Sequence, residues 1–245
     1  MKPFTHLLTL SLLPAIQAKL LLDFNATRGD DPSTLGTLNL EAERGDKPDS
    51  NSDELYIKLG EDPDGNPALH FHRDEGYIRA EYHALKDEME SDTTYYIGYS
   101  LSMAQLQQSL MIWQFKEYSA YTDGSGGANI PLSLEVKEDA LNFRYQASAD
   151  DGRETQWSVV PELNTPHHIG LVINTSDDGW VELYWDGEKQ EFDTTGETRL
   201  SATTFPGQAE PKFGAYRGEE VEIDTYVYAI QIGTEMEDIV EAAGL

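Results

Sequence analysis

Residues 168–187, HIGLVINTSDDGWVELYWDG, contain two short runs of β-forming residues, each followed by a turn. His168–Ile173 and Trp180–Trp185 each have the length of a strand. The dipeptides Asp178-Gly and Asp186-Gly favour tight turns. Runs of this kind, repeated at regular spacing, are typical of a β-sandwich or a β-jelly roll.

The same pattern extends through most of the chain. Further strand-length runs are Leu20–Ala26, Leu55–Leu59, Tyr77–His83, Thr94–Leu101, Leu110–Phe115, Leu132–Val136, Leu141–Tyr145, Trp157–Val160, Phe213–Tyr216 and Val221–Ile232. Only Met103–Ser109 and Glu235–Ala243 have a helical pattern. No repeat, linker or change of composition marks a second domain, so we expect one all-β domain built from two antiparallel sheets.

The N-terminus has the pattern of a secretory signal. Lys2 supplies a positive start, Phe4–Ile16 is apolar, and Ile16-Gln-Ala18 is a plausible cleavage site. The apolar run is too short to cross a bilayer. We therefore predict a signal peptide over residues 1–18, a mature domain over residues 19–245, and a secreted, extracellular protein without a membrane partner.

Charge and cysteine content exclude several classes of site. The chain has 17 Lys and Arg against 45 Asp and Glu, a net charge of −28. Such a chain repels phosphate, which argues against nucleic acid as a general partner. It has no cysteine, so it has no disulfide, no cysteine nucleophile and no cysteine-ligated metal site.

Three predicted strands carry polar side chains on one face, whereas the other face of each is more apolar. They are Tyr77–His83, Met111–Glu117 and Pro211–Arg217. Because side chains alternate along a strand, the polar faces hold Arg79, Glu81 and His83, then Gln114 and Lys116, then Lys212 and Tyr216. One such strand is an ordinary amphipathic strand, but three together favour a ligand groove.

The histidines give weaker indications. His70 and His72 share one face of a strand, where they can line a groove. His167 and His168 are adjacent, so they point to opposite faces and make a poor pair of metal ligands.

Several of these segments occur in an order that resembles the heparin-lyase-like jelly-roll polysaccharide lyases. They are Arg79-Ala-Glu81, Tyr95–Leu101, Trp113-Gln-Phe-Lys116, Asn129–Glu135, His167–Asn174, Val181–Gly187 and Lys212-Phe-Gly-Ala-Tyr-Arg217. The chain is most similar to the glucuronan lyases of polysaccharide lyase family 20, from about residue 78 to 233. The resemblance implies a concanavalin-like β-jelly roll with the substrate in a concave cleft.

The resemblance also implies a reaction, the β-elimination of a uronic-acid polymer, in particular β-1,4-glucuronan. The Lys-x-Gly-x-Tyr element is present, with Tyr216 as the base and acid. An ordinary tyrosine, with a pKa of about 10, is a poor base, so a cation must lie close to it. The alginate and heparin lyase relatives carry Gln-x-His where this chain has Gln114-Phe-Lys116, a departure that removes a candidate catalytic histidine.

The remaining roles follow from the same resemblance. The residues expected to stabilise the C6 carboxylate are Arg79, Gln114 and Lys116, and those expected to bind the substrate are Glu81, His83, Asn129 and Lys212. Glu81 would orient Arg79. A structural Ca²⁺ is implied away from the cleft, with Asp224 and Asn25 as candidate oxygen ligands. We expect no organic cofactor, an acidic polysaccharide as partner, and a monomer.

Two alternatives remain open. Fungal β-glucanases of glycoside hydrolase family 131 share the jelly roll. The chain looks similar to them because one of its strands carries an Arg and a Glu and a following strand carries another Glu. Glu81 and Glu117 would then be the hydrolytic carboxylate pair. The second alternative is a non-catalytic carbohydrate-binding jelly roll, in which Trp113, Trp180 and Trp185 stack on sugars.

Overall fold

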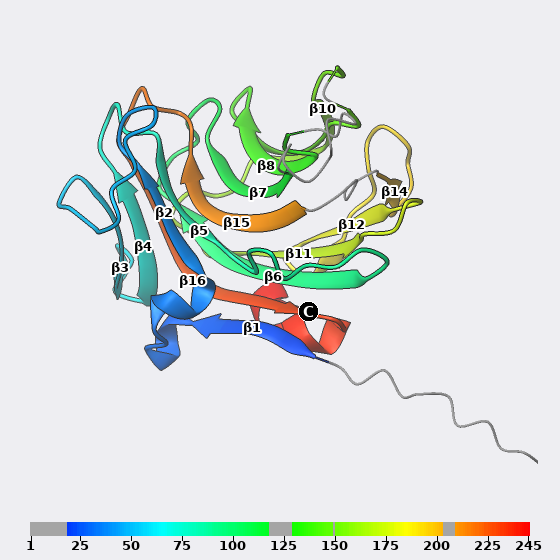
Figure 1. The fold of residues 1–245 in the computed structure, drawn as a ribbon, viewed down its shortest axis with the longest axis horizontal. Coiled ribbons are helices and arrows are strands. Elements are labelled where there is room, and N and C mark those ends of the chain that lie inside the picture. The colour runs from blue at the N-terminus through cyan, green and yellow to red at the C-terminus, as the bar shows by residue number, and fades with distance from the viewer. Residues whose placement is uncertain (1–18, 118–128, 149, 203–208) are drawn as a thin grey trace, which may run out of the picture.

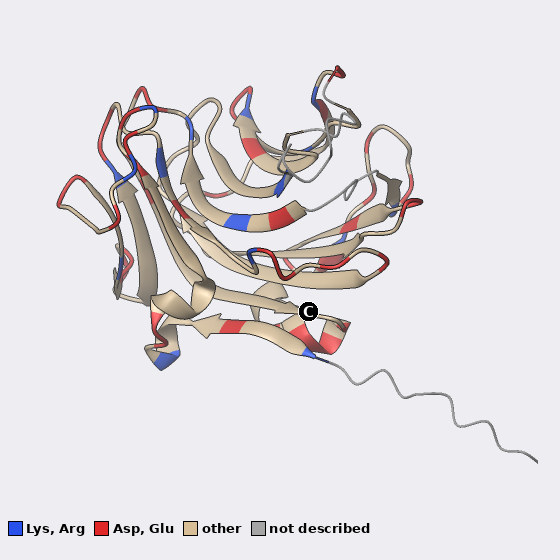
Figure 2. Ribbon diagram, in the orientation of Figure 1, with Lys and Arg blue, Asp and Glu red and all other residues tan. Residues whose placement is uncertain are grey.

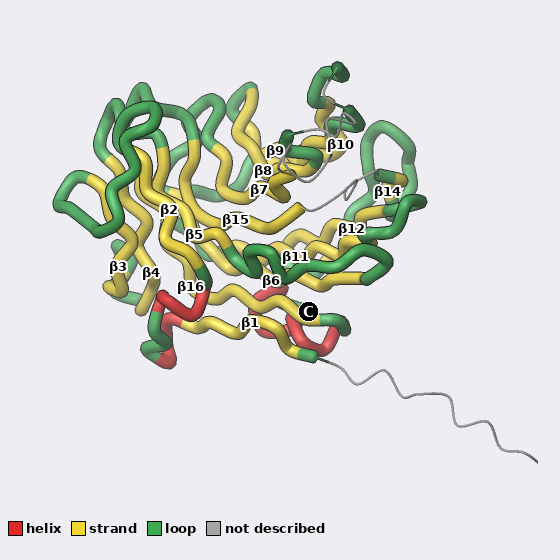
Figure 3. Tube along the Cα trace, in the orientation of Figure 1, coloured by secondary structure: helices red, strands yellow, loops and turns green. Residues whose placement is uncertain are grey.

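The computed structural model describes residues 19–117, 129–148, 150–202 and 209–245, and two antiparallel β-sheets pack against each other in it (Figure 1). This confirms the predicted all-β jelly-roll sandwich. Helices are confined to short pieces beside β1 and at the C-terminus (Figure 3). Among the described residues, no helix has the length and apolar character needed to span a membrane. The predicted signal peptide lies outside these residues.

The first sheet has nine strands. In spatial order, its main path is β13 (Glu188–Lys189), β12 (Trp180–Trp185), β11 (His167–Asn174), β6 (Thr94–Met103), β16 (Ile223–Gly233), β4 (Pro67–Arg73) and β3 (Leu55–Glu61). Two strands lie off this path, with β1 (Leu20–Asn25) paired to β16 and β14 (Leu200–Ser201) paired to β12. We call it the nine-stranded sheet.

The second sheet has seven strands and carries the site described below. Its order is β10 (Glu154–Val159), β9 (Ala140–Tyr145), β8 (Leu132–Lys137), β7 (Met111–Glu117), β15 (Ala209–Tyr216), β5 (Arg79–His83) and β2 (Thr37–Glu41). Within the described residues, the helical pieces are η1 (Ala26–Arg28), η2 (Pro32–Leu35), η3 (Met236–Ile239) and α1 (Val240–Ala243).

Apolar side chains from both sheets form one core between them. Tyr99 of β6 and Phe213 of β15 are buried, and their rings meet edge to face with centroids 5.0 Å apart. On β5, Ala80 and Tyr82 also belong to this core. The alternate residues of β5 therefore project from the other face of the seven-stranded sheet, as its sequence pattern predicts.

Three local expectations differ from the structure. The helical pattern of Met103–Ser109 is wrong, because β6 continues to Met103 and a loop follows. Strands β2 and β4 were not among the strand-length runs. β2 is a short strand between loops, and β4 holds two histidines and begins with a proline, so neither has a high content of β-forming residues.

Candidate active site

A pocket of about 350 Å³ lies on the face of the seven-stranded sheet that is turned away from the core. Strands β2, β5, β7 and β15 form its floor. The residues that line it are Thr37, Asn39, Lys47, Arg79, His83, Lys86, Gln114, Lys116, Asn129, Ile130, Lys212 and Tyr216. The sequence-predicted residues Arg79, His83, Gln114, Lys116, Asn129, Lys212 and Tyr216 thus meet in one place.

The lining of this pocket is cationic. It contains five cations, namely Lys47, Arg79, Lys86, Lys116 and Lys212. Among the residues that the structure describes, no Asp or Glu belongs to the lining. Acidic residues lie on many loops and on several strands of the molecule (Figure 2). A protein with a net charge of −28 therefore has a locally positive pocket.

Two buried carboxylates beside the pocket hold Arg79 in place. Its guanidinium forms ion pairs with Glu41 (Nη2–Oε2, 3.1 Å) and Glu81 (Nε–Oε2, 3.3 Å). It also donates a hydrogen bond to Asn39 Oδ1 at 3.2 Å. The second Glu81 oxygen accepts a 2.5 Å hydrogen bond from the Gln114 amide. Glu81 therefore fixes two of the groups expected to bind a carboxylate.

The location of Glu81 corrects its expected place among the substrate-binding residues. Its side chain is only 1% exposed and does not belong to the pocket lining. Buried charged groups need partners, and Arg79 and Gln114 satisfy this one. Glu81 is thus a positioning residue, as its expected effect on Arg79 implies, and it is not a residue that touches a ligand.

Three arginines, Arg44, Arg79 and Arg217, lie beside Tyr216. Arg79 is its cross-strand neighbour, and the guanidinium carbon lies 4.5 Å from the centre of the tyrosine ring. Arg44 makes a hydrogen bond with the Tyr216 side chain, and this contact raises the pKa of Arg44 above its ordinary value. A cation beside a phenol favours the charge that appears on its oxygen when the proton leaves.

Gly214 fixes the path of the chain between Lys212 and Tyr216. Its φ is +134°, and a Cβ there would lie 2.3 Å from the carbonyl oxygen of Ala80. The register with β7 also shifts between Phe213 and Tyr216, as in a β-bulge. The glycine of the Lys-x-Gly-x-Tyr element is therefore required by the close approach of β5 and β15.

Lys212 is a buried cation in the middle of the site. It pairs across the sheet with His83 on one side and Gln114 on the other. Burial lowers the pKa of Lys212, against the opposing attraction of Glu81. On the same face of the sheet, His83 Nε2 makes a short contact with the buried carboxylate of Glu210. The site thus has cations lining the pocket and buried carboxylates packed beside them.

Lys116 and Asn129 lie at the edge of the pocket. Lys116 Nζ donates a 3.2 Å hydrogen bond to the backbone oxygen of Asn129. Asn129 is exposed and precedes the segment that leads into β8. Both positions can reach a ligand that extends beyond Gln114.

Sequence reasoning missed several residues of the site. They are Thr37, Asn39, Glu41, Arg44, Lys47, Lys86 and Glu210. The alternation in Thr37-Leu-Asn-Leu-Glu41 was a usable signal for β2, because Leu40 is buried and Asn39 lines the pocket. The loop residues Arg44, Lys47 and Lys86 carried no periodic signal.

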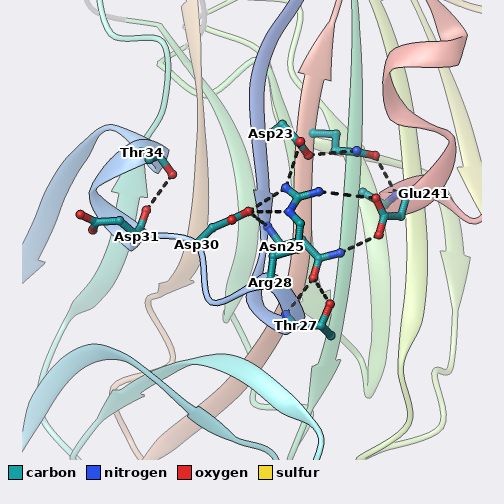
Figure 4. Close-up of polar contacts among 10 residues, drawn as sticks. Asp23, Asn25, Thr27, Arg28, Asp30, Asp31, Thr34 and Glu241 are labelled. Carbon is teal, nitrogen blue, oxygen red and sulfur yellow. Dashed lines mark hydrogen bonds and ion pairs between the residues drawn. The ribbon is translucent and has the colours of Figure 1, made fainter.

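The predicted calcium ligands do not come together. Asn25 pairs with Ala229 on β16, five residues along that strand from Asp224, which is about 16 Å. The Asn25 amide is engaged by Thr27 and Glu241, and the guanidinium of Arg28 supplies the positive charge there (Figure 4). The Arg28 guanidinium forms ion pairs with Asp30 at 2.7 Å and with Asp23 at 2.9 Å.

Asp224 likewise does not fit calcium. Its Oδ1 lies against ring nitrogens of His70 and His72, whereas Ca²⁺ prefers oxygen ligands throughout. These two histidines lie on β4 of the nine-stranded sheet, so they do not line the pocket on the seven-stranded sheet.

The two alternative readings find less support in the geometry. Glu81 is buried and paired, so it is not available as a hydrolytic acid or nucleophile. The side chain of Glu117 lies outside the described residues. Trp113 is fully buried in the core, while Trp180 and Trp185 belong to β12 of the other sheet. None of these tryptophans lines the pocket.

Comparison with known proteins identifies the fold. No family model matches the chain, and no curated protein does either. Solved structures do match. An endo-β-1,4-glucuronan lyase from Trichoderma reesei aligns with a TM-score of 0.55 and 17% identity, over 83% of this chain and 97% of that one.

Two alginate lyases give similar values. For alginate lyase AlyC3, the TM-score is 0.60 at 12% identity, covering 86% of this chain and 96% of that one. For alginate lyase PA1167 from Pseudomonas aeruginosa, it is 0.53 at 15% identity, covering 82% and 99%. At such identities the likeness shows a shared fold, so this chain has the jelly-roll fold found in these structures.

Proposed function

We propose that this protein is a secreted polysaccharide lyase that cleaves a uronic-acid polymer, β-1,4-glucuronan in particular, by β-elimination. The observation that carries the proposal is the pocket itself, in which five cations surround Gln114 and Tyr216. A polyanion is repelled by the net negative protein at long range, but salt limits this repulsion to about 8–10 Å. Within that distance the cations of the pocket attract a carboxylate.

The first step of the proposed mechanism is removal of the proton at C5. The phenolate oxygen of Tyr216 takes this proton, and the electron pair moves onto the C6 carboxylate as an enolate-like charge. Arg79 binds that carboxylate through charged hydrogen bonds and Gln114 through its amide. Since Glu81 and Glu41 already hold Arg79 in position, little reorganisation is needed as the charge develops.

In the second step the double bond between C4 and C5 forms and the bond from C4 to O4 breaks. The departing O4 takes the proton from Tyr216, which returns to its starting state. In β-1,4-glucuronan the C5 proton and O4 lie on the same side of the sugar ring, so one residue can serve both steps. Arg44 and Arg79 contact Tyr216, so positive charge lies beside the residue that moves the proton.

The other cations have binding roles in this proposal. Lys212 lies between His83 and Gln114 on the sheet, so its charge adds to that of Arg79 at the reacting carboxylate. Lys116 and Asn129 lie at the edge and would bind a neighbouring sugar unit. The structures that share the fold are named as alginate and glucuronan lyases, which supports a uronate polymer as substrate.

Absorbance of the unsaturated uronate product tests the proposal. The mature protein, residues 19–245, is incubated with β-1,4-glucuronan, alginate, heparin and a neutral β-glucan, and the ultraviolet band of the product is followed. We expect a rise with glucuronan that exceeds the rise with alginate. A release of reducing sugar from the neutral glucan without any ultraviolet rise would overturn the proposal in favour of hydrolysis.

A further inference from the structure

A second cluster of polar side chains lies on the nine-stranded sheet, on the face turned away from the core. His70 and His72 of β4 and Asp224 of β16 form it. Asp224 Oδ1 is 2.6 Å from His70 Nε2 and 2.8 Å from His72 Nδ1. One carboxylate oxygen is therefore shared by two imidazole nitrogens, and none of the three residues lines the pocket described above.

The outer ring nitrogens of both histidines also have partners. His72 Nε2 lies 3.1 Å from Asp74 Oδ1, and His70 Nδ1 lies 3.3 Å from the hydroxyl of Tyr56. His72 thus has a carboxylate at each ring nitrogen.

The ring nitrogens of His70 and His72 and the carboxylate of Asp224 are arranged as in a metal site. Histidines that bind metals usually direct one nitrogen at the ion and donate the other N–H to a carboxylate or another oxygen, which fixes the ring. His72 can do so with Asp74 as the outer acceptor, and His70 with Tyr56. The inner nitrogens of both histidines are then free to bind the ion beside Asp224.

Aromatic rings hold the two imidazoles in place. Tyr56 stacks on His72 with ring centroids 4.6 Å apart, and Tyr226 stacks on His70 at 4.5 Å. The register of the strands produces these contacts, since Tyr56 and Asp224 both lie opposite His72, on β3 and β16, and Tyr226 lies opposite His70. The cluster is therefore assembled by three paired strands and not by a loop.

We propose that His70, His72 and Asp224 bind one Zn²⁺ ion, through His70 Nε2, His72 Nδ1 and a carboxylate oxygen of Asp224. Two imidazoles and one carboxylate are a ligand set that suits zinc, whereas calcium requires oxygen ligands. The three ligand atoms lie within 4.8 Å of one another, and tetrahedral zinc needs them about 3.3 Å apart. The Asp224 side chain is 21% exposed, so water can fill the fourth position.

Calorimetry on the metal-free mature chain, carrying no added histidine tag, tests this site. We expect one Zn²⁺ per chain with a dissociation constant in the micromolar range or below, and no comparable binding of Ca²⁺. In His70→Gln and Asp224→Asn the dissociation constant should rise by about 100-fold, and in Asp74→Asn by about 10-fold. Replacement of zinc by Co²⁺ should give the visible bands of a tetrahedral ion in the unaltered chain, and His70→Gln and Asp224→Asn should lose them.

His167→Gln is the matched control. His167 also pairs with one aspartate, Asp186, at 2.9 Å, but it is not part of the three-residue cluster. Its zinc affinity should equal that of the unaltered chain. The proposal is overturned if a folded metal-free chain binds no zinc, if it binds calcium more tightly than zinc, or if His70→Gln and Asp224→Asn retain the affinity of the control.

Discussion

The pocket and the histidine cluster lie on different sheets and have opposite electrostatic designs. In the pocket, cations such as Arg79 and Lys212 line the cavity, and carboxylates such as Glu81 and Glu210, on the same face of the sheet, are buried beside them and do not line it. In the cluster, one carboxylate, Asp224, lies between two imidazoles at the surface. The first arrangement attracts an anion, and the second attracts a metal cation.

This difference shows that the arrangement of charges within each site matters more than the total charge of the chain. Both sites come from polar residues at alternate positions on strands that are otherwise apolar. The overall charge of −28 describes neither of them. The two sites should also act independently, so each provides a control for variants of the other.

Tyr216→Phe should have the largest effect on the pocket. The loss of a group that removes and returns a proton costs about 10³-fold in kcat. The zinc affinity of the His70, His72 and Asp224 cluster should not change, because Tyr216 is on the other sheet. Kinetics on glucuronan measure the first effect, with Tyr184→Phe on β12 as the matched tyrosine control. Retention of more than a tenth of the rate would exclude Tyr216 as the base.

Glu81→Gln should lower kcat by about 10²-fold with a smaller change in KM. The amide is nearly the same size but no longer holds Arg79 by charge, so the carboxylate-binding groups lose their alignment. The free energy of unfolding should fall by about 1–3 kcal/mol, because the largely buried guanidinium of Arg79 loses one of its two carboxylate partners. A change in KM alone, at constant kcat, would contradict a positioning role.

Gly214→Ala should reduce both stability and activity. Its added Cβ meets the backbone oxygen of Ala80 at 2.3 Å, and the left-handed φ is strained for alanine. We expect a loss of about 1–3 kcal/mol in the free energy of unfolding and a fall in kcat as Tyr216 shifts. Denaturant unfolding measures the first quantity. Gly65→Ala is the control, since a Cβ there contacts nothing although its φ is also positive.

Lys212→Arg should change the pH dependence more than the rate at neutral pH. Burial lowers the pKa of Lys212, so this ammonium loses its proton at a lower pH than an exposed lysine does. Activity that depends on its charge should therefore fall as the pH rises through that lowered value. Arginine stays charged, so the alkaline fall in kcat/KM should move to higher pH. An identical alkaline limb in both proteins would show that Lys212 does not control it.

Much of the fold and the centre of the pocket could be predicted from the sequence. Alternation alone placed Arg79, Gln114 and Lys212 on exposed faces, and β-propensity identified most of the strands. The residues from loops, such as Lys47 and Lys86, could not be found in this way, because no period connects them to the sheet.

Side-chain partners were also beyond prediction. The contact of Asp224 with His70 and His72 depends on the register of β16 against β4, which a single sequence does not determine. The same is true of Arg28, whose guanidinium supplies the positive charge beside Asn25 where calcium was expected.

Cleavage of glucuronan in water enriched in heavy oxygen tests the central claim most directly. Elimination breaks the bond between C4 and O4 without adding water, so mass spectrometry of early products should show an unsaturated end and no heavy oxygen gained at cleavage. The unlabelled products should disappear in Tyr216→Phe and persist in His70→Gln. One heavy oxygen at each new reducing end, with no unsaturated end, would show hydrolysis and contradict the account.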